Sequence, residues 1–118
     1  DGLRRYLSIV ASSANTTNNI ILIDEIDNGL HYSAYKKLWE SIFALATDTN
    51  KQVFITTHSQ ETLYRLYQML EENSQYQDAF RLYTIEQTLK KDHQAYKYGY
   101  AEFKDACQNE VELRSIVL

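Results

Sequence analysis

Two short apolar runs limit what this 118-residue chain can fold into. Residues 20–23 read IILI and residues 52–57 read QVFITT, both rich in β-branched side chains. Continuous runs of this length are typical of strands that are covered on both faces in a parallel sheet. Between them, apolar side chains recur at three- and four-residue spacing, which predicts a helix over residues 33–47. The order strand, helix, strand predicts two parallel neighbours joined by a right-handed crossover.

The patterns elsewhere in the chain predict further helices and one hairpin. In chain order they are a helix over residues 2–14, a helix from about Gln60, strands Phe80–Glu86 and His93–Tyr98 with a polar turn around Lys90–Asp92, and a short helix near residues 101–107. This order is that of an α/β domain with a parallel central sheet.

Composition and charge narrow the classes of function. The chain is 44% hydrophobic and 24% charged, which is ordinary for a globular protein with a buried core. No apolar run approaches the ~18 residues that a membrane helix needs, so we expect no membrane contact. The net charge of −4, with acids and bases interspersed, gives no support for direct nucleic-acid binding. The single cysteine, Cys107, cannot form an internal disulfide, and a cytoplasmic setting is therefore expected.

Polar side chains follow both predicted strands at the point where each strand ends. Asp24 and Glu25 follow the first, and Thr57, His58 and Ser59 end or follow the second. Ligands of parallel sheets bind beyond the carboxyl ends of the strands, where these residues should meet. Two successive acids point in different directions, so one can face Mg²⁺ while the other faces a water molecule. With a histidine that donates to a phosphate oxygen, the set predicts nucleotide phosphoryl transfer.

The same residues also have plain structural interpretations. An Asp-Glu pair after an apolar run is common in proteins. Ser59 is suited to be the N-cap of the next helix. Asp27-Asn28-Gly29 reads as an ordinary turn, with Gly29 at positive φ.

The stretch ILIDEIDNGLH, followed by FITTHS, resembles the second half of an ATP-binding-cassette-type ATPase domain. The resemblance is closest to the soluble, non-transporter branch of overcoming-lysogenization-defect-like and AAA-type ATPases. In that family a Walker B strand ends in Asp-Glu, as Ile20–Glu25 does, and a D-loop follows, as at Asp27–His31. A switch histidine ends the next strand, as His58 does. The resemblance covers about residues 1–63 with good specificity and extends more loosely through the hairpin to Arg114. It implies a three-layer, P-loop NTPase-like partial domain, with parallel core strands flanked by helices and a C-terminal antiparallel hairpin.

The resemblance also implies a role for each matched residue. Asp24 would hold Mg²⁺, Glu25 would polarise the attacking water as general base, and His58 would contact the γ-phosphate of ATP. The remaining matched residues would lie at the nucleotide or dimer interface of a homodimer: Asp1 and Gly2 of the signature peptide, and Asp27, Asn28, Gly29 and Leu30 of the D-loop. The D-loop sequence DNGLH differs from the D-loops of transporters.

A phosphate-binding loop of the form G-x-x-x-x-G-K-[ST] does not occur in the 118 residues. We therefore expect the chain to be the C-terminal part of a larger ATPase, with ATP and Mg²⁺ bound only by the intact protein. The 118 residues alone should be inactive, and bare strand edges should make them self-associate.

Two other classes of function stay open. The first is a degenerate ATPase-like assembly or binding module without catalysis. The second is a metal-dependent nuclease that uses Asp24, Glu25 and Asp27, with further acids drawn from Asp78, Glu86 and Asp92. The sequence does not say whether an ATPase of this kind acts on DNA or on an effector protein.

Overall fold

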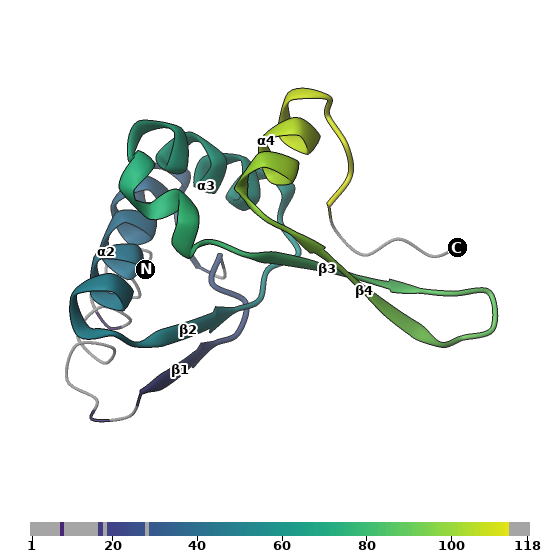
Figure 1. Ribbon diagram of the computed structural model, residues 1–118, viewed down its shortest axis with the longest axis horizontal. Coiled ribbons are helices and arrows are strands. Elements are labelled where there is room, and N and C mark those ends of the chain that lie inside the picture. Colours follow the sequence, from purple (N-terminus) through teal and green to yellow (C-terminus); the bar gives the residue numbers. More distant parts are fainter. Residues whose placement is uncertain (1–7, 9–16, 18, 28, 114–118) are drawn as a thin grey trace. The chain divides into compact units, whose positions relative to one another are not determined.

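The computed structural model describes residues 8, 17, 19–27 and 29–113, which form two compact units, Asp1–Thr57 and His58–Leu118 (Figure 1). The helix predicted over residues 2–14 lies outside the described residues, apart from Ser8, which is helical. In the described part of the chain, no helix is both long and apolar enough to cross a membrane.

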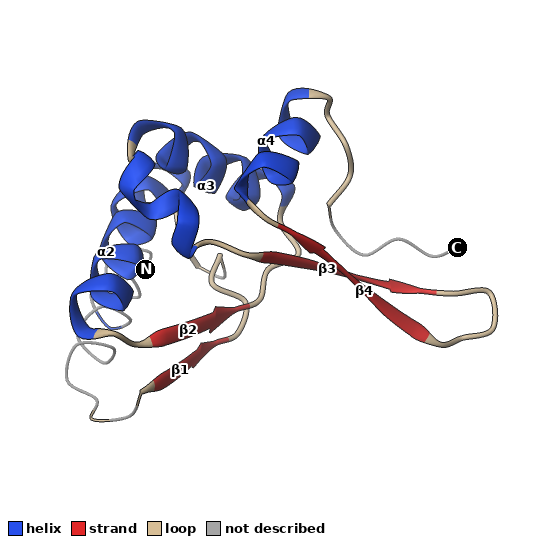
Figure 2. Ribbon diagram, viewed as in Figure 1, coloured by secondary structure: helices blue, strands red, loops and turns tan. Residues whose placement is uncertain are grey.

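The first unit contains the predicted strand–helix–strand arrangement. Its elements are β1 (Ile20–Ile23), a 3₁₀ turn η1 (Tyr32–Ala34), α2 (Tyr35–Thr49) and β2 (Gln52–Ile55) (Figure 2). The two strands pair in parallel, with Ile20 opposite Gln52 and Ile23 opposite Ile55. The predicted parallel pairing is confirmed, and both carboxyl ends therefore lie at one edge of this sheet.

Helix α2 forms because its apolar residues share one face. Tyr35, Leu38, Trp39 and Ile42 are buried on that face, and the helix packs against β2. The helix ends where helix-forming residues give way to threonine, aspartate and asparagine. Asn50 adopts the left-handed conformation at φ 54, and its N–H donates to the carbonyl of Ala46.

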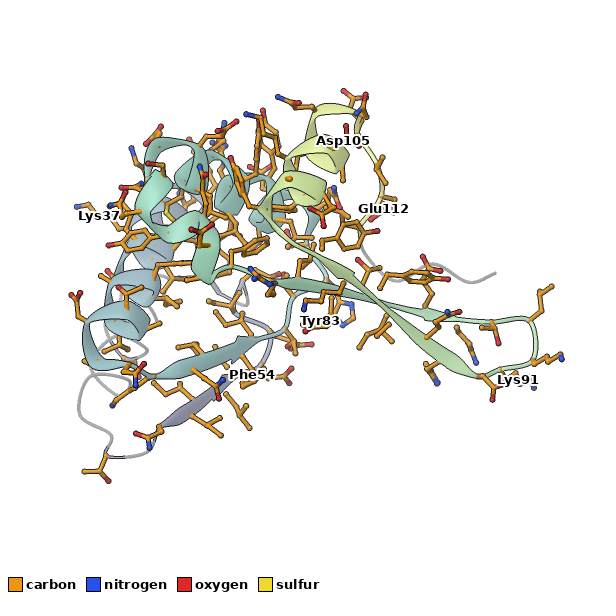
Figure 3. All side chains as sticks on the ribbon, in the orientation of Figure 1. Lys37, Phe54, Tyr83, Lys91, Asp105 and Glu112 are labelled. Carbon is orange, nitrogen blue, oxygen red and sulfur yellow. The ribbon has the colours of Figure 1, made fainter. Side chains whose placement is uncertain are left out.

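The two faces of the β1–β2 sheet differ in burial. Successive side chains alternate between faces, and on one face Ile21 and Ile23 are half-buried. On the other face Ile20, Leu22 and Phe54 are exposed over 54%, 77% and 54% of their surfaces. Figure 3 labels Phe54 on β2. The prediction that the strands are covered on both faces is thus wrong for this chain, because the described sheet has two strands and alternate side chains remain in solvent. The three-layer arrangement stays a prediction.

The second unit contains two helices and the predicted hairpin. Its elements are α3 (Gln60–Glu72), a 3₁₀ turn η2 (Ser74–Ala79), β3 (Leu82–Gln87), β4 (His93–Tyr98) and α4 (Tyr100–Gln108). Strands β3 and β4 pair antiparallel, as predicted, and the structure places Leu82 opposite Tyr98. The turn η2 was not expected from the sequence, because 3₁₀ turns carry no long apolar period.

A small core holds the second unit together. Its buried apolar residues are Leu63, Leu66, Met69, Leu70, Phe80, Phe103, Ala106 and Leu113. The rings of Phe80 and Phe103 lie 4.8 Å apart between centroids. The hydroxyl of buried Thr84 donates to the Leu113 carbonyl at 3.0 Å, which fastens β3 to the segment after α4. The base of the hairpin is therefore fastened to the rest of the second unit, an addition that a lone two-stranded hairpin needs to be stable.

Candidate functional site

The candidate site begins where β1 and β2 end. Backbone pairing continues for one step beyond the two strands: the Thr56 N–H donates to the Ile23 carbonyl at 3.0 Å, and the Ile26 N–H donates to the Thr56 carbonyl at 3.1 Å. These two bonds enclose Asp24 and Glu25 in a turn beside Thr56. The strand pairing thus fixes where the two acids leave the sheet.

The hydroxyl of Thr56 contacts both acidic residues. Its Oγ1 accepts a hydrogen bond from the Glu25 N–H at 2.8 Å. The same hydroxyl donates a short hydrogen bond to Oδ1 of Asp24. The side chains of Asp24 and Glu25 are exposed, so both carboxylates are accessible to solvent or to a ligand.

Glu25 adopts an unusual backbone conformation. Its φ is 49, in the left-handed region, which costs a residue with a Cβ roughly 1–2 kcal/mol. Such conformations persist when surrounding contacts hold them, and they occur often at functional sites. Here the flanking hydrogen bonds to Thr56 supply those contacts. The chain therefore turns sharply at the residue for which the sequence predicts a catalytic role.

A second hydroxyl holds the turn that follows. Oγ1 of Thr57 donates to Oδ1 of Asp27 at 2.6 Å, and the Leu30 N–H donates to the Asp27 carbonyl at 3.2 Å. Gly29 has φ 79, so the predicted turn with a glycine at positive φ is confirmed. Ile26, which lies between Glu25 and Asp27, is fully buried and anchors this segment.

Several predicted site residues are not tested by the described contacts. Asp1, Gly2 and Asn28 lie outside the described residues, and their roles stay predictions. His58 is exposed and is the first residue of the second unit; its approach to Glu25 also stays a prediction. Oγ of Ser59 accepts the Thr62 N–H at 3.2 Å, which confirms that Ser59 is the N-cap of α3.

The donor set fits Mg²⁺ that arrives with a nucleotide. Mg²⁺ is usually held by one or two carboxylates, with waters and substrate phosphates completing its shell. The exposed Asp24 carboxylate at the end of β1 is suited to that arrangement. Among the described residues, no three or more His, Cys, Asp or Glu side chains are grouped to hold a metal ion.

Sequence reasoning missed Thr56, the residue that links the two acids. A signal for it was nevertheless present. Once β1 and β2 are paired with Ile23 opposite Ile55, the next residue on each strand brings Thr56 opposite Asp24. A hydroxyl at that place can reach the carboxylate. The signal depends on the strand register, which was not known from the sequence.

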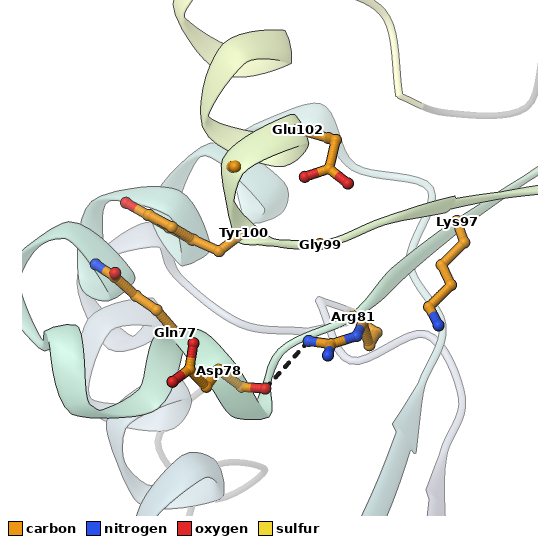
Figure 4. A pocket seen from close by; sticks show the side chains of 8 residues that line it. Gln77, Asp78, Arg81, Lys97, Gly99, Tyr100 and Glu102 are labelled. Carbon is orange, nitrogen blue, oxygen red and sulfur yellow. Dashed lines mark hydrogen bonds between the residues drawn. The ribbon is translucent and has the colours of Figure 1, made fainter.

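A separate cavity lies in the second unit, where η2, β3, β4 and α4 meet (Figure 4). Its volume is about 480 Å³, and Asp78, Arg81, Lys97 and Glu102 are among its lining residues. Nη1 of Arg81 donates to the Asp78 carbonyl at 3.1 Å, which ties the guanidinium to the wall. The two acids and two bases among these residues give the lining no net charge. Asp78, one of the further acids named for a nuclease, lines it, whereas Asp24, Glu25 and His58 do not.

Two parallel strands that end in paired acids and hydroxyls define an α/β region with a candidate ligand site at the carboxyl edge of its sheet. The family described as AAA ATPase domain matches residues 2–63, which is more than half of the chain. This chain therefore belongs to the AAA ATPase domain family. The AAA-type ATPase part of the sequence resemblance is confirmed.

One curated relative supports the same assignment. An ATP/GTP phosphatase of Helicobacter pylori (strain ATCC 700392 / 26695) is 41% identical to this chain over 75 residues. The alignment covers 61% of this chain and 20% of the relative, so the chain spans about a fifth of the relative's length. No solved structure matches the chain significantly.

Proposed function

We propose that this chain supplies the water-activating part of the ATP-hydrolysing site in an ATP-binding-cassette-type member of the AAA ATPase domain family. Asp24 would hold Mg²⁺ bound with ATP, Glu25 would act as general base, and His58 would contact the γ-phosphate. The observation that carries the proposal is the turn after β1. There two successive acids are held beside Thr56 at the carboxyl end of a parallel strand.

Each residue has a defined task in this proposal. Glu25 orients the attacking water and accepts its proton, as a carboxylate within hydrogen-bond reach of a water can do. Asp24 orients the metal-bound nucleotide through its carboxylate, and His58 donates a hydrogen bond to a γ-phosphate oxygen, where charge increases during transfer. Mg²⁺ bound with ATP supplies neutralisation of the phosphate charge.

The rest of the site comes from other parts of the intact protein in this proposal. The 118 residues contain no G-x-x-x-x-G-K-[ST] segment, so the backbone cradle for the phosphates would be contributed by residues outside them. The chain would then be the C-terminal part of the ATPase domain and would hydrolyse no ATP alone. The intact protein would act as a homodimer, with Asp1, Gly2 and the segment Asp27–Leu30 at the interface. Dimer closure would drive an action on DNA or on an effector protein.

The substitution Glu25→Gln in the intact protein tests the proposal. It removes the base and keeps the side-chain shape, so ATP binding should be retained while the hydrolysis rate falls by about 10²- to 10⁴-fold. Titration with a fluorescent nucleotide measures ATP binding, and phosphate release measures the hydrolysis rate. Asp48→Asn, at an exposed position of α2, removes one negative charge away from the site and should leave both unchanged.

The outcomes separate the proposal from its alternatives. Normal hydrolysis by Glu25→Gln would contradict the catalytic assignment. An intact wild-type protein that binds ATP without hydrolysing it would favour the degenerate assembly module. Mn²⁺-dependent nicking of DNA in the absence of ATP, lost on substitution of Asp24, would favour the nuclease.

A further inference from the structure

We propose that Thr56 is a positioning residue that holds Asp24 and Glu25 in the arrangement needed for ATP hydrolysis. This inference rests on the proposed function and adds a residue that the motif resemblance does not assign. It is carried by the contacts of the Thr56 hydroxyl, which is bonded to both acids.

Two kinds of hydrogen bond meet at Thr56. The backbone bonds, from its N–H to Ile23 and from Ile26 to its carbonyl, extend the strand ladder and would form with almost any residue at position 56. The hydroxyl bonds, to the Glu25 N–H and to Asp24 Oδ1, need a side-chain oxygen. A substitution of the hydroxyl alone therefore separates the arrangement of the acids from the pairing of the strands.

The direction of the two hydroxyl bonds determines how Asp24 is bound: its Oδ1 accepts the proton of the Thr56 hydroxyl. A threonine hydroxyl carries one proton and accepts through its oxygen. Because the Glu25 N–H donates to that oxygen at 2.8 Å, the hydroxyl proton is directed to Oδ1 of Asp24. Asp24 is thereby held as a hydrogen-bond acceptor in one rotamer. A carboxylate has about four lone-pair sites, so this bond is compatible with cation binding.

The same hydroxyl supports the turn at Glu25. The backbone of Glu25 has φ 49, and its N–H points to Oγ1 of Thr56. Loss of the hydroxyl removes this acceptor and allows the backbone to relax toward negative φ, which redirects the side chain of Glu25. Misplacement of a catalytic group by about 1 Å can lower a rate by roughly 10²-fold. One hydroxyl thus couples the metal-binding acid to the general base.

The test compares variants of the intact protein at position 56. Thr56→Val is nearly isosteric and lacks the hydroxyl, whereas Thr56→Ser retains it. We expect Thr56→Val to lower kcat for ATP hydrolysis by about 10- to 100-fold and to raise the Mg²⁺ concentration that gives half-maximal rate, with Thr56→Ser close to wild type. Thr47→Val removes a hydroxyl that bonds only helix carbonyls among its described partners, and should leave kcat unchanged.

A second measurement does not depend on activity. Hydrogen–deuterium exchange of the peptide covering residues 23–27, without nucleotide, should be faster in Thr56→Val than in wild type, Thr56→Ser or Thr47→Val. If Thr56→Val does not fold, Thr56→Ala, which also keeps the backbone bonds, replaces it in both measurements. If Thr56 had a merely structural role, Thr56→Val would change the melting temperature, and Thr56→Ser would not restore kcat.

The outcomes distinguish this inference from the proposed function. Wild-type kcat in the hydroxyl-deficient variant, together with an inactive Glu25→Gln protein, would overturn the role of Thr56 alone. A lowered kcat without faster exchange over residues 23–27 would also overturn it. If Glu25→Gln hydrolyses ATP normally, the proposed function itself fails.

Discussion

Several residues with a Cβ have positive φ in the described part of the chain, and they differ in the structure around them. Asn50 ends α2 and Lys91 lies in the hairpin turn, where left-handed residues are common. Glu25 has φ 49 directly after a strand, where the chain would otherwise continue extended. Its conformation is held by hydrogen bonds to a residue 31 positions away. The strain at Glu25 is thus a property of the site, whereas that at Asn50 belongs to an ordinary helix end.

Gly29 allows a prediction at the same scale. Its φ of 79 is unfavourable for any L side chain, so Gly29→Ala should destabilise the intact protein by roughly 1–2 kcal/mol. Gly99→Ala is the matched control, because Gly99 is extended at φ −82 and an added Cβ would lie 3.5 Å from its nearest neighbour, Glu102 Oε2. Urea denaturation measures both changes. Equal losses of stability would show that the turn at Gly29 does not need its left-handed conformation.

At the scale of elements, a polar cluster joins α3 to α4. Oε1 of Glu71 accepts from Nζ of Lys104 at 2.9 Å and from the Tyr67 hydroxyl at 3.0 Å. The hydrogen bond from Lys104, and to a smaller extent that from Tyr67, lowers the pKa of Glu71. The hydrogen bond to Glu71 in turn raises the pKa of Lys104. The two helices are therefore linked by an ion pair beside their apolar contacts.

This ion pair predicts a pH dependence. The pKa of Glu71 is lowered from about 4.5. Its contribution to the free energy of unfolding is therefore present above pH 4.5 and is lost as the pH falls through the lowered pKa. The pKa of Lys104 is raised from about 10.5. Its contribution to the free energy of unfolding is therefore present below pH 10.5 and is lost as the pH rises through the raised pKa. Lys104→Met should lower the melting temperature slightly at pH 7 and by less at pH 3, because the contribution of Glu71 declines as the pH falls below about 4.5. Lys90→Met, at the exposed hairpin turn, should not change the melting temperature at either pH. Equal decreases in melting temperature for Lys104→Met at pH 3 and pH 7 would contradict the assignment of the effect to the Glu71–Lys104 ion pair.

At the scale of the whole molecule, the candidate residues are divided between the two units. Asp24, Glu25 and Asp27 belong to the first unit, and His58 begins the second. The first unit also has an exposed apolar face on its sheet, formed by Ile20, Leu22 and Phe54. Contiguous apolar surfaces of this kind are typical of contact sites. The 118 residues thus carry acids that are already ordered by the strand pairing, beside a face that is suited to further protein contact.

The exposed sheet face predicts self-association of the isolated 118 residues. Burial of Leu22 between copies would be favourable, so sedimentation velocity should show species larger than a monomer as concentration rises. Leu22→Lys should reduce this association. Leu89→Lys makes the same change at a hairpin-turn residue that is 89% exposed, and should not reduce it. Monomers at every concentration would show that the face does not drive assembly.

The sequence by itself determined β1, α2, β2, α3, the hairpin and α4, and the identity of the acids. The run IILI, the apolar face of α2 and the alternation of the hairpin are local patterns, and local patterns follow from backbone geometry that each residue carries with it. Tertiary structure alone decided that Thr56 bonds both Asp24 and Glu25, that Glu25 is left-handed and that Leu22 is exposed. These features join residues 31 and 32 positions apart or depend on what covers a sheet. The physical reason is that strand register and burial are set by pairing between distant segments, which no short stretch of sequence contains.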